Sequence, residues 1–299
     1  MADQNDARAA HAEETTDVDE ARSVAREAGA KEREKEIEEH SRLRAVAVFE
    51  IIRREGIGEL GRDFNALFWS GVAAGLSIGF SLLGEAFLAA HLPKAGWAPL
   101  ITNLGYSVGF LIVILGRLQL FTENTLTAVL PVMARRRLVW VIILGRLWGI
   151  VFAANLVGCM IFAAFMSATG VLSPEMAREV LDISRTILAH PPAEMFARGI
   201  VAGWLIAALV WMLPSAEGNE FIVIVLVTYL IALGDFAHVI AGSAEAFYLL
   251  FERQAAIGDL VTRFLLPTLA GNVFGGTVVF ALTAYAQVRY EIEESPPKS

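Results

Sequence analysis

Two apolar segments of the sequence are each interrupted by polar side chains where a membrane-spanning helix would normally continue. The first interruption, GRLQLFTENTLTA at 116–128, carries an arginine, a glutamine, a glutamate, an asparagine and threonines. The second is GDFAHVIAGS at 234–243. Backbone at membrane depth leaves a helix only where it lines a cavity or is buried in protein. Residues 221–233 and 239–250 are each too short to span a bilayer, so we expect half-helices that meet near mid-membrane.

Such breaks carry a definite chemistry. The N-terminus of a half-helix presents unpaired N–H groups and a positive potential. Two such termini that point into one cavity would favour an anion. The two breaks therefore predict recognition of a small anion inside the membrane.

The composition supports a membrane setting for these breaks. The chain has 299 residues, of which 56% are hydrophobic, and its mean hydropathy is +0.54. Soluble domains have an apolar content of about 45–50%. A polar connection at 170–193 separates long apolar regions, each with room for the roughly 20 residues that cross a bilayer. We predict an all-α integral membrane protein with six transmembrane helices at 64–90, 98–133, 138–168, 194–213, 221–250 and 262–288.

Basic residues predict the orientation of these spans. Arg53, Arg54 and Arg62 precede the first span, and arginines at 135–137 follow the second. By the positive-inside rule these flanks are cytoplasmic. Six crossings then place both termini in the cytoplasm of a bacterial or archaeal inner membrane. One feature weighs against this: the connection at 214–220, which would also be cytoplasmic, has no lysine or arginine.

The charge pattern divides the chain into four parts. The net charge is −8, and residues 1–40 account for −7 of it. We predict a partly disordered and partly helical acidic tail at 1–40, because such a segment has little apolar surface to bury. An amphipathic, basic helix at 41–62 is expected to lie on the membrane surface. The channel domain follows at 63–290, and a cytoplasmic C-terminal tail at 291–299.

The two halves of the channel domain share a sequence pattern. ANLVGCMIF at 154–162 is similar to GNVFGGTVVF at 271–280, which sets Asn155 and Asn272 apart by 117 residues. The same offset aligns Phe121 with His238, so the two breaks are in register. Each half has three spans, an odd number, and the second half must therefore be inverted in the membrane. Paired broken segments in inverted halves indicate a membrane substrate site.

Four stretches resemble one family. LFTENT, FAHVIAG, RGIVAGWLIAALVWM at 198–212 and GNVFGG are similar to motifs of the formate/nitrite transporters, and the resemblance covers roughly residues 60–290. It implies an aquaporin-like fold and a homopentamer with one pore per protomer. It also implies small monovalent anions or their weak acids as substrates, with no cofactor and no metal.

The resemblance assigns residues to the pore. It implies that Thr122 and His238 form a central polar pair and that Leu120 and Phe121 form an apolar constriction. Glu123 and Asn124 belong to the same motif, and we include them in the predicted substrate pore with the other four residues. We expect His238 to exchange a proton with the substrate, because the charge of histidine changes near physiological pH.

The sequence departs from the family pattern at several polar positions. Gly203 and Gly242 stand where the family often has asparagine, and Ala237 stands where an acid often precedes the central histidine. Near Ile187 the family often has a lysine, and the nearest base here is Arg185, which we include as a possible accessory residue. These departures favour an alternative function, an aquaporin-like pore for small neutral solutes. The chain lacks the Asn-Pro-Ala motif of a true aquaporin.

Three acids lie in the predicted membrane region, and two of them, Glu85 and Glu123, have two interpretations each. Glu85 lies inside the first span, and Glu123 and Asp235 lie in the breaks. An ionisable group in a span is costly and functional by default, so we list Glu85 and Asp235 as possible accessory residues. Glu85 could instead lie near the outer end of its span in contact with water. Glu123 could simply cap the following half-helix.

The remaining features suggest no further chemistry. We predict that His190 is solvated, because it lies next to a proline in an outer loop. Gly71, Gly75 and Gly79 form a ridge of small residues that favours close helix packing, within a protomer or between protomers. No metalloprotease or serine-hydrolase motif is present, so we predict that the protein is not an enzyme. No basic footprint for nucleic acid is present either. Membrane lipid is the expected surrounding.

Overall fold

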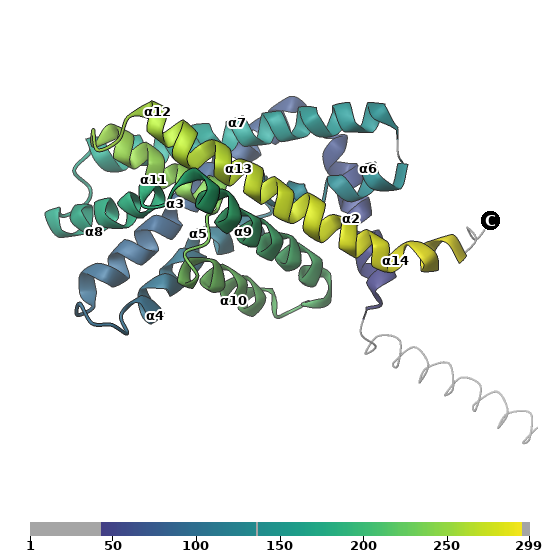
Figure 1. The fold of residues 1–299 in the computed structure, drawn as a ribbon, viewed down its shortest axis with the longest axis horizontal. Coiled ribbons are helices and arrows are strands. Elements are labelled where there is room, and N and C mark those ends of the chain that lie inside the picture. Colours follow the sequence, from purple (N-terminus) through teal and green to yellow (C-terminus); the bar gives the residue numbers. More distant parts are fainter. Residues whose placement is uncertain (1–42, 136, 295–299) are drawn as a thin grey trace, which may run out of the picture. The chain divides into compact units, whose positions relative to one another are not determined.

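The computed structural model describes residues 43–135 and 137–294, and the regular elements of that part of the chain are helices (Figure 1). The predicted acidic tail at 1–40 lies outside the described residues, as do residues 295–299. The α-helices are α2 (Ala45–Leu60), α3 (Phe64–His91), α4 (Pro99–Thr102), α5 (Ser107–Leu115), α6 (Val129–Arg135), α7 (Leu138–Ala168), α8 (Pro174–Arg185), α9 (Pro192–Met212), α10 (Glu220–Leu233), α11 (Val239–Phe251), α12 (Ile257–Asp259), α13 (Leu266–Val273) and α14 (Leu282–Glu294).

Short 3₁₀ and π segments join several of these helices. The 3₁₀ turns are η1 (Asn103–Tyr106), η2 (Glu123–Thr125), η3 (Thr186–Leu188) and η4 (Leu213–Ser215). The π-helical segments η5 (Leu260–Leu265) and η6 (Phe274–Ala281) make α12, α13 and α14 one long rod, drawn in yellow in Figure 1.

Four helical stretches are long and apolar enough to cross a membrane. They are Phe64–His91, Leu138–Ala168, Pro192–Ser215 and Ile257–Glu291. Shorter apolar helices occupy Pro99–Leu115, Glu220–Leu233 and Val239–Phe251. The prediction of an all-α membrane protein is thus confirmed for the described residues, while the number of crossings stays a prediction.

The predicted glycine ridge packs against α7 of the same chain. A Cβ atom on Gly75 would overlap the carbonyl oxygen of Asn155, and one on Gly158 would overlap the carbonyl oxygen of Val72. Backbones approach this closely only where side chains are absent. Helices α9 and α13 meet in the same way, since a Cβ on Gly203 would overlap the carbonyl oxygen of Asn272. Gly203 is therefore a packing residue here.

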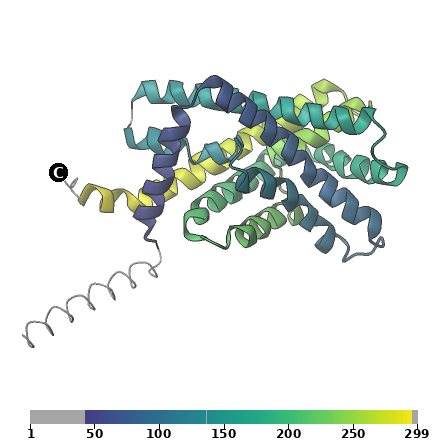
Figure 2. The same cartoon turned by 180° about the vertical axis from the view of Figure 1, so that it is seen from behind.

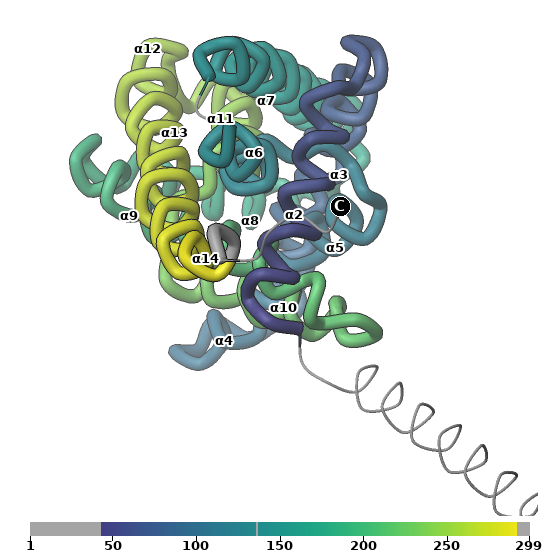
Figure 3. Tube along the Cα trace, turned by 90° about the vertical axis from the view of Figure 1, so that its right-hand side faces the viewer, coloured from purple at the N-terminus to yellow at the C-terminus, as the bar shows by residue number. Residues whose placement is uncertain are grey.

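Helix α2 packs on the part of the chain that follows the first break. It contacts α6 and α14 and buries Val48, Phe49 and Ile52, while Arg53 on its polar side pairs with Glu50 at 2.7 Å. Figure 2 shows α2 beside the C-terminal rod, and Figure 3 shows α6 among α2, α7 and that rod. The start of α6, residues Val129, Leu130 and Pro131, is thereby buried in the protein, as an interrupted helix at membrane depth requires.

Candidate functional site

Both predicted interruptions are present in the structure. Helix α5 ends at Leu115, and α6 begins only at Val129. Helix α10 ends at Leu233, and α11 begins at Val239. Each break opens with a residue other than glycine in the left-handed region, Arg117 with φ of 51° and Asp235 with φ of 52°. Such strain persists only where the surrounding structure imposes it.

A buried asparagine holds the first break. Asn155 on α7 accepts a hydrogen bond from the Phe121 amide at 2.9 Å. Its amide group donates to the carbonyl oxygens of Gly71 and Gln119, each at 2.8 Å. The side chain therefore satisfies backbone groups of the break that would otherwise be unpaired in a membrane interior, where each costs several kcal/mol.

A second buried asparagine does the same for the other break. Asn272 on α13 accepts from the Val239 amide at 2.8 Å and donates to the carbonyl oxygens of Gly199 and Ala237 at 2.9 and 2.8 Å. By these bonds, Val239 in the second half corresponds to Phe121 in the first half, because each donates its amide hydrogen to the asparagine of its own half. The predicted alignment of Phe121 with His238 is thus wrong by one residue, because the first half has one more residue between its break and its asparagine.

The central feature of the site is a hydrogen bond between the two breaks. Thr122 Oγ1 and His238 Nε2 are 2.7 Å apart, although the residues are 116 apart in sequence. Both side chains are buried, and the ring of Phe110 lies edge-on to the imidazole with centroids 5.0 Å apart. The resemblance paired these two residues, and the structure places them in contact.

The other imidazole nitrogen fixes which atom carries the proton. His238 is the N-cap of α11, and its Nδ1 accepts from the Ala241 amide at 3.1 Å. Because an amide N–H can only donate, Nδ1 is unprotonated in this arrangement and the ring proton lies on Nε2. Nε2 then donates to Thr122, and the threonine hydroxyl keeps its own hydrogen for another acceptor.

Two cavities approach this hydrogen bond. One of about 680 Å³, here the Glu123 cavity, is lined by Leu120, Glu123 and Asn124 among others. The second, of about 210 Å³ and here the His238 cavity, is lined by His238 and Phe236 among others. Leu120, Phe121 and Thr122 are all buried. A short run of the first break and His238 thus lie between the two cavities.

The predicted constriction residues occupy different surroundings. Leu120 lines the Glu123 cavity. Phe121 lines neither cavity and packs its ring against Trp148 and Phe152, with centroids 5.9 and 5.1 Å apart. Its position is set by α7 as well as by the break. Both residues add apolar surface beside Thr122.

Glu123 and Asn124 have distinct roles within the first break. Asn124 donates to Gln119 Oε1 and to the Leu120 carbonyl oxygen, each at 3.1 Å, and so ties the loop to itself. Glu123 lines the Glu123 cavity, and its buried Oε1 atom has no hydrogen-bond partner within the described residues. The described structure gives the Glu123 side chain no hydrogen bond to the backbone at the start of α6, so it does not support the capping interpretation.

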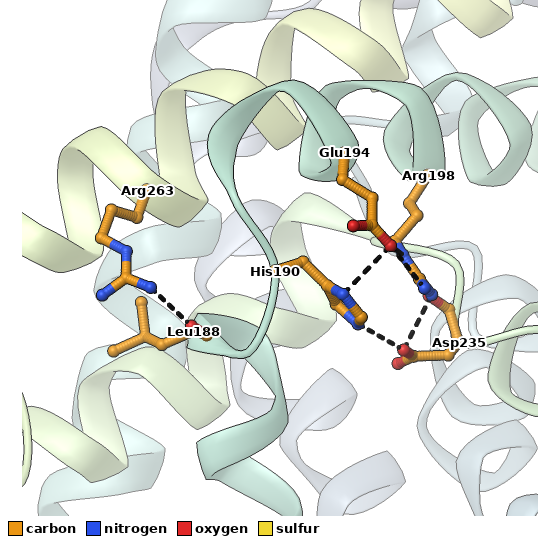
Figure 4. Close-up of polar contacts among 6 residues, drawn as sticks. All are labelled: Leu188, His190, Glu194, Arg198, Asp235 and Arg263. Atoms are coloured by element: carbon orange, nitrogen blue, oxygen red, sulfur yellow. Dashed lines mark hydrogen bonds and ion pairs between the residues drawn. The ribbon is translucent and has the colours of Figure 1, made fainter.

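Asp235 belongs to an ion-pair cluster at the rim of the His238 cavity (Figure 4). Its Oδ2 atom accepts from His190 Nε2 at 2.9 Å and from Arg198 Nη1 at 2.8 Å. Glu194 Oε1 pairs with His190 Nδ1 at 3.1 Å and with Arg198 Nη2 at 2.8 Å. His190, which we predicted to be solvated, keeps 23% of its side chain exposed and is also bound by Asp235 from 45 residues away. The cluster fixes the second break to the start of α9.

Two of the predicted accessory residues differ in their positions. Glu85 is 9% exposed and lines the His238 cavity. Arg185 lies on an exposed surface, where it donates to Asp182 and Gln254 at 2.9 Å each, and it is not among the residues that line the cavity. The structure does not bring Arg185 to the site, since these two partners hold its guanidinium elsewhere.

Sequence reasoning missed one residue of the site. Glu245 on α11 is 8% exposed and lines the His238 cavity together with Glu85. The available signal was an ionisable residue within an apolar half-helix, which is rare and marks function by default. Among the described residues no group of histidine, cysteine, aspartate or glutamate has the arrangement of a metal site.

Comparison with known proteins identifies the fold that carries this site. The model of the family described as "Formate/nitrite transporter" matches residues 46–286. The chain is 46% identical over 265 residues to the inner membrane protein YfdC of Escherichia coli strain K12, covering 88% of this chain and 86% of that protein. It is 25% identical over 271 residues to the formate channel FocA of the same strain, covering 81% and 93%.

Solved structures show the same architecture. A pentameric formate channel with formate bound matches with a TM-score of 0.62 and 22% identity, over 76% of this chain and 98% of that one. An FNT family ion channel matches with a TM-score of 0.66 and 19% identity, over 81% and 96%. The family and the channels among these matches are transport proteins rather than enzymes, in agreement with the motifs and with the broken helices. The chain belongs to the formate/nitrite transporter family.

Proposed function

We propose that the protein is a membrane channel for small monovalent anions of the formate and nitrite type, or for their weak acids. The family and the formate channels among its relatives support this substrate class. The observation that carries it is the buried Thr122–His238 hydrogen bond at the N-terminus of α11, between two cavities. A helix N-terminus attracts an anion.

The surroundings of this bond argue for passage of a neutral species. Leu120 in the Glu123 cavity and the ring of Phe110 against His238 give it apolar surroundings, and burying an isolated charge there is very costly. A protonated weak acid avoids this cost. His238 is placed to supply the proton, and the Thr122 hydroxyl is placed to donate a hydrogen bond to an oxygen of the substrate.

We extend the proposal to topology and assembly. The two breaks share an asparagine brace and a left-handed residue, which supports an inverted repeat with six crossings. The pentameric relative supports a homopentamer, and the relative named as an inner membrane protein supports that location. The arginines at 53–62 and near 135 support cytoplasmic termini.

The topology is open to a direct test. Reporter fusions placed after Arg137 and after Pro192 are expected to lie on opposite sides of the membrane, because one helix, α7, long enough to span, lies between them together with the polar α8. Alkaline phosphatase and fluorescent-protein activities measure the side. The same side for both fusions would contradict the six-crossing arrangement.

The substrate class is tested by flux into proteoliposomes. We expect formate and nitrite to enter faster in the presence of the protein and faster at lower pH, because more substrate is then in the neutral form. Hydrosulfide and lactate define the size limit. Entry of glycerol but of none of these anions would refute the proposed function.

An aquaporin-like pore for small neutral solutes is the second candidate. The described residues that line the His238 cavity include three acids and no lysine or arginine. An anion gains no attraction from side chains of that kind. The glycerol arm of the flux measurement separates the two candidates.

A further inference from the structure

The His238 cavity contains two carboxyl groups that nothing in the described structure neutralises. Glu85 comes from α3 and Glu245 from α11, and both line this cavity of about 210 Å³. They are 9% and 8% exposed. Neither carboxyl group has a hydrogen bond or an ion pair to any residue within 43–135 and 137–294.

Asp235 provides a contrast within the same cavity. Its carboxylate is bound by His190 and Arg198, so its charge is already compensated (Figure 4). A buried polar group without a partner is costly, and a buried charge without a partner is more so. The fold therefore provides charged partners for Asp235 but, within the described residues, none for Glu85 or Glu245.

The other walls of the cavity suit a cation. The rings of Tyr106, Phe236 and Phe264 line it, and the faces of aromatic rings attract ammonium groups. No lysine or arginine is among the described lining residues. The volume corresponds to a handful of water molecules at about 30 Å³ each, which suits a solute of a few heavy atoms.

We propose that the His238 cavity binds a small monovalent organic cation of the ammonium class between Glu85 and Glu245. This cavity is one of the two beside the Thr122–His238 hydrogen bond, so the cation would lie at one end of the anion pathway proposed above. It adds a second ligand class to a chain whose relatives include formate channels.

The proposal includes an exchange of protons. In the proposed exchange one carboxyl group carries a proton while the site is empty, since a buried charge without a partner is very costly. When an ammonium group takes its place beside it, the O–H bond of one carboxyl breaks, the proton leaves to bulk water, and the carboxylate pairs with the cation. Four other titratable groups line the cavity with Glu85 and Glu245: Tyr106 from η1, His190 after η3, and Asp235 and His238 from the second break. At the rim, Glu194 of α9 pairs with His190, and Arg198 of α9 pairs with Asp235.

Calorimetry on the full chain in lipid nanodiscs tests the proposal, with methylammonium chloride as the probe. We expect saturable binding with release of about one proton per cation near pH 6, read from a pH-indicator dye in weak buffer. Glu85→Gln and Glu245→Gln keep the side-chain shape, and each is expected to weaken binding tenfold or more. The double variant is expected to release no proton.

Matched controls distinguish this site from general surface charge. Glu179→Gln removes an acid that pairs with Lys94 away from the cavity, and binding is expected to be unchanged. Sodium chloride at the same concentration is expected to give no saturable signal. The proposal is overturned by no saturable methylammonium binding below about 100 mM, by equal binding of sodium, or by binding that survives in the double variant. Formate flux measured on the same preparation reports separately on the proposed function.

Discussion

Replacement of Gly75 by leucine is expected to abolish most recovery of the folded protein. A side chain at this position would overlap the carbonyl oxygen of Asn155, which belongs to the backbone of α7 and cannot rotate away. Overpacking of a dense core costs about 1–3 kcal/mol even where neighbouring side chains can adjust. Here the two helices themselves would have to separate.

The effect is expected to reach the first break as well as the packing. Asn155 braces that break through Phe121 and Gln119 and also binds the Gly71 carbonyl oxygen of α3, so a shift of α7 removes three hydrogen bonds to buried backbone. Yield of monodisperse protein by fluorescence-detected size exclusion is the measurement. We expect at least a tenfold loss, since about 1.4 kcal/mol already corresponds to a factor of ten.

The same substitution on α7 provides a control. A Cβ atom on Gly145 would meet no other atom within 4 Å, so Gly145→Leu adds equal volume to a spanning helix without a clash. We expect near-normal yield from this variant. Equal yields from Gly75→Leu and Gly145→Leu would show that the close approach of α3 and α7 does not depend on glycine.

The positions of the breaks followed from the sequence because their cause is local. Polar residues within apolar segments marked both interruptions, and the predicted half-helices 221–233 and 239–250 agree within one residue with α10 and α11. The glycine ridge was also readable, since spacing alone places Gly71, Gly75 and Gly79 on one helix face. Its partner, α7, was not readable, because that requires knowing which helices are neighbours.

The contacts that hold the site depend on such distant neighbours. Asn155 and Asn272 gave a repeat pattern in the sequence, but their role as braces becomes visible only when α7 and α13 lie beside the breaks. The hydrogen bond between His190 and Asp235 was not predicted, because the two residues are 45 positions apart in sequence. Arg185 fails as an accessory residue for the same reason, since Gln254 holds it from 69 residues away.

Glu245 was missed for a different reason. It lies at the seventh position of α11, where an ionisable residue in a predicted membrane half-helix is a signal for function that the sequence analysis did not use. The motif around His238 marks only the break itself. The structure shows that the cavity continues along α11 to this carboxyl group.

Substitution of His238 by asparagine is expected to separate proton exchange from helix capping. In the structure His238 does both tasks, since Nδ1 caps α11 through the Ala241 amide and Nε2 contacts Thr122. Asparagine is among the best N-cap residues, so its side-chain oxygen can replace Nδ1 as the acceptor. It cannot exchange a proton near neutral pH. The folded protein should therefore persist while the chemistry is lost.

The expected result is a change in the pH dependence of formate flux. In the native chain, flux should rise steeply as the pH falls, because His238 can pass a proton to the substrate and because more of the substrate is then neutral in solution. In His238→Asn we expect only the weak rise that follows from the free acid in solution, and at least a tenfold lower rate at the acidic end. His238→Ala also loses the cap, so its free energy of unfolding is expected to fall by about 1 kcal/mol, and the yield of folded protein with it.

Thr122→Val serves as the matched variant because valine keeps the shape and removes the hydroxyl. The substrate would lose one hydrogen bond to an anionic oxygen, worth about 1.5–3 kcal/mol, so flux should fall roughly tenfold or more while its pH dependence remains. In a plot of formate flux against pH, His238→Asn is thus expected to change the shape of the curve, and Thr122→Val only its height. If His238→Asn in well-folded protein keeps both the rate and the pH profile of the native chain, the histidine acts only as a cap, and the proton must reach the substrate from another group.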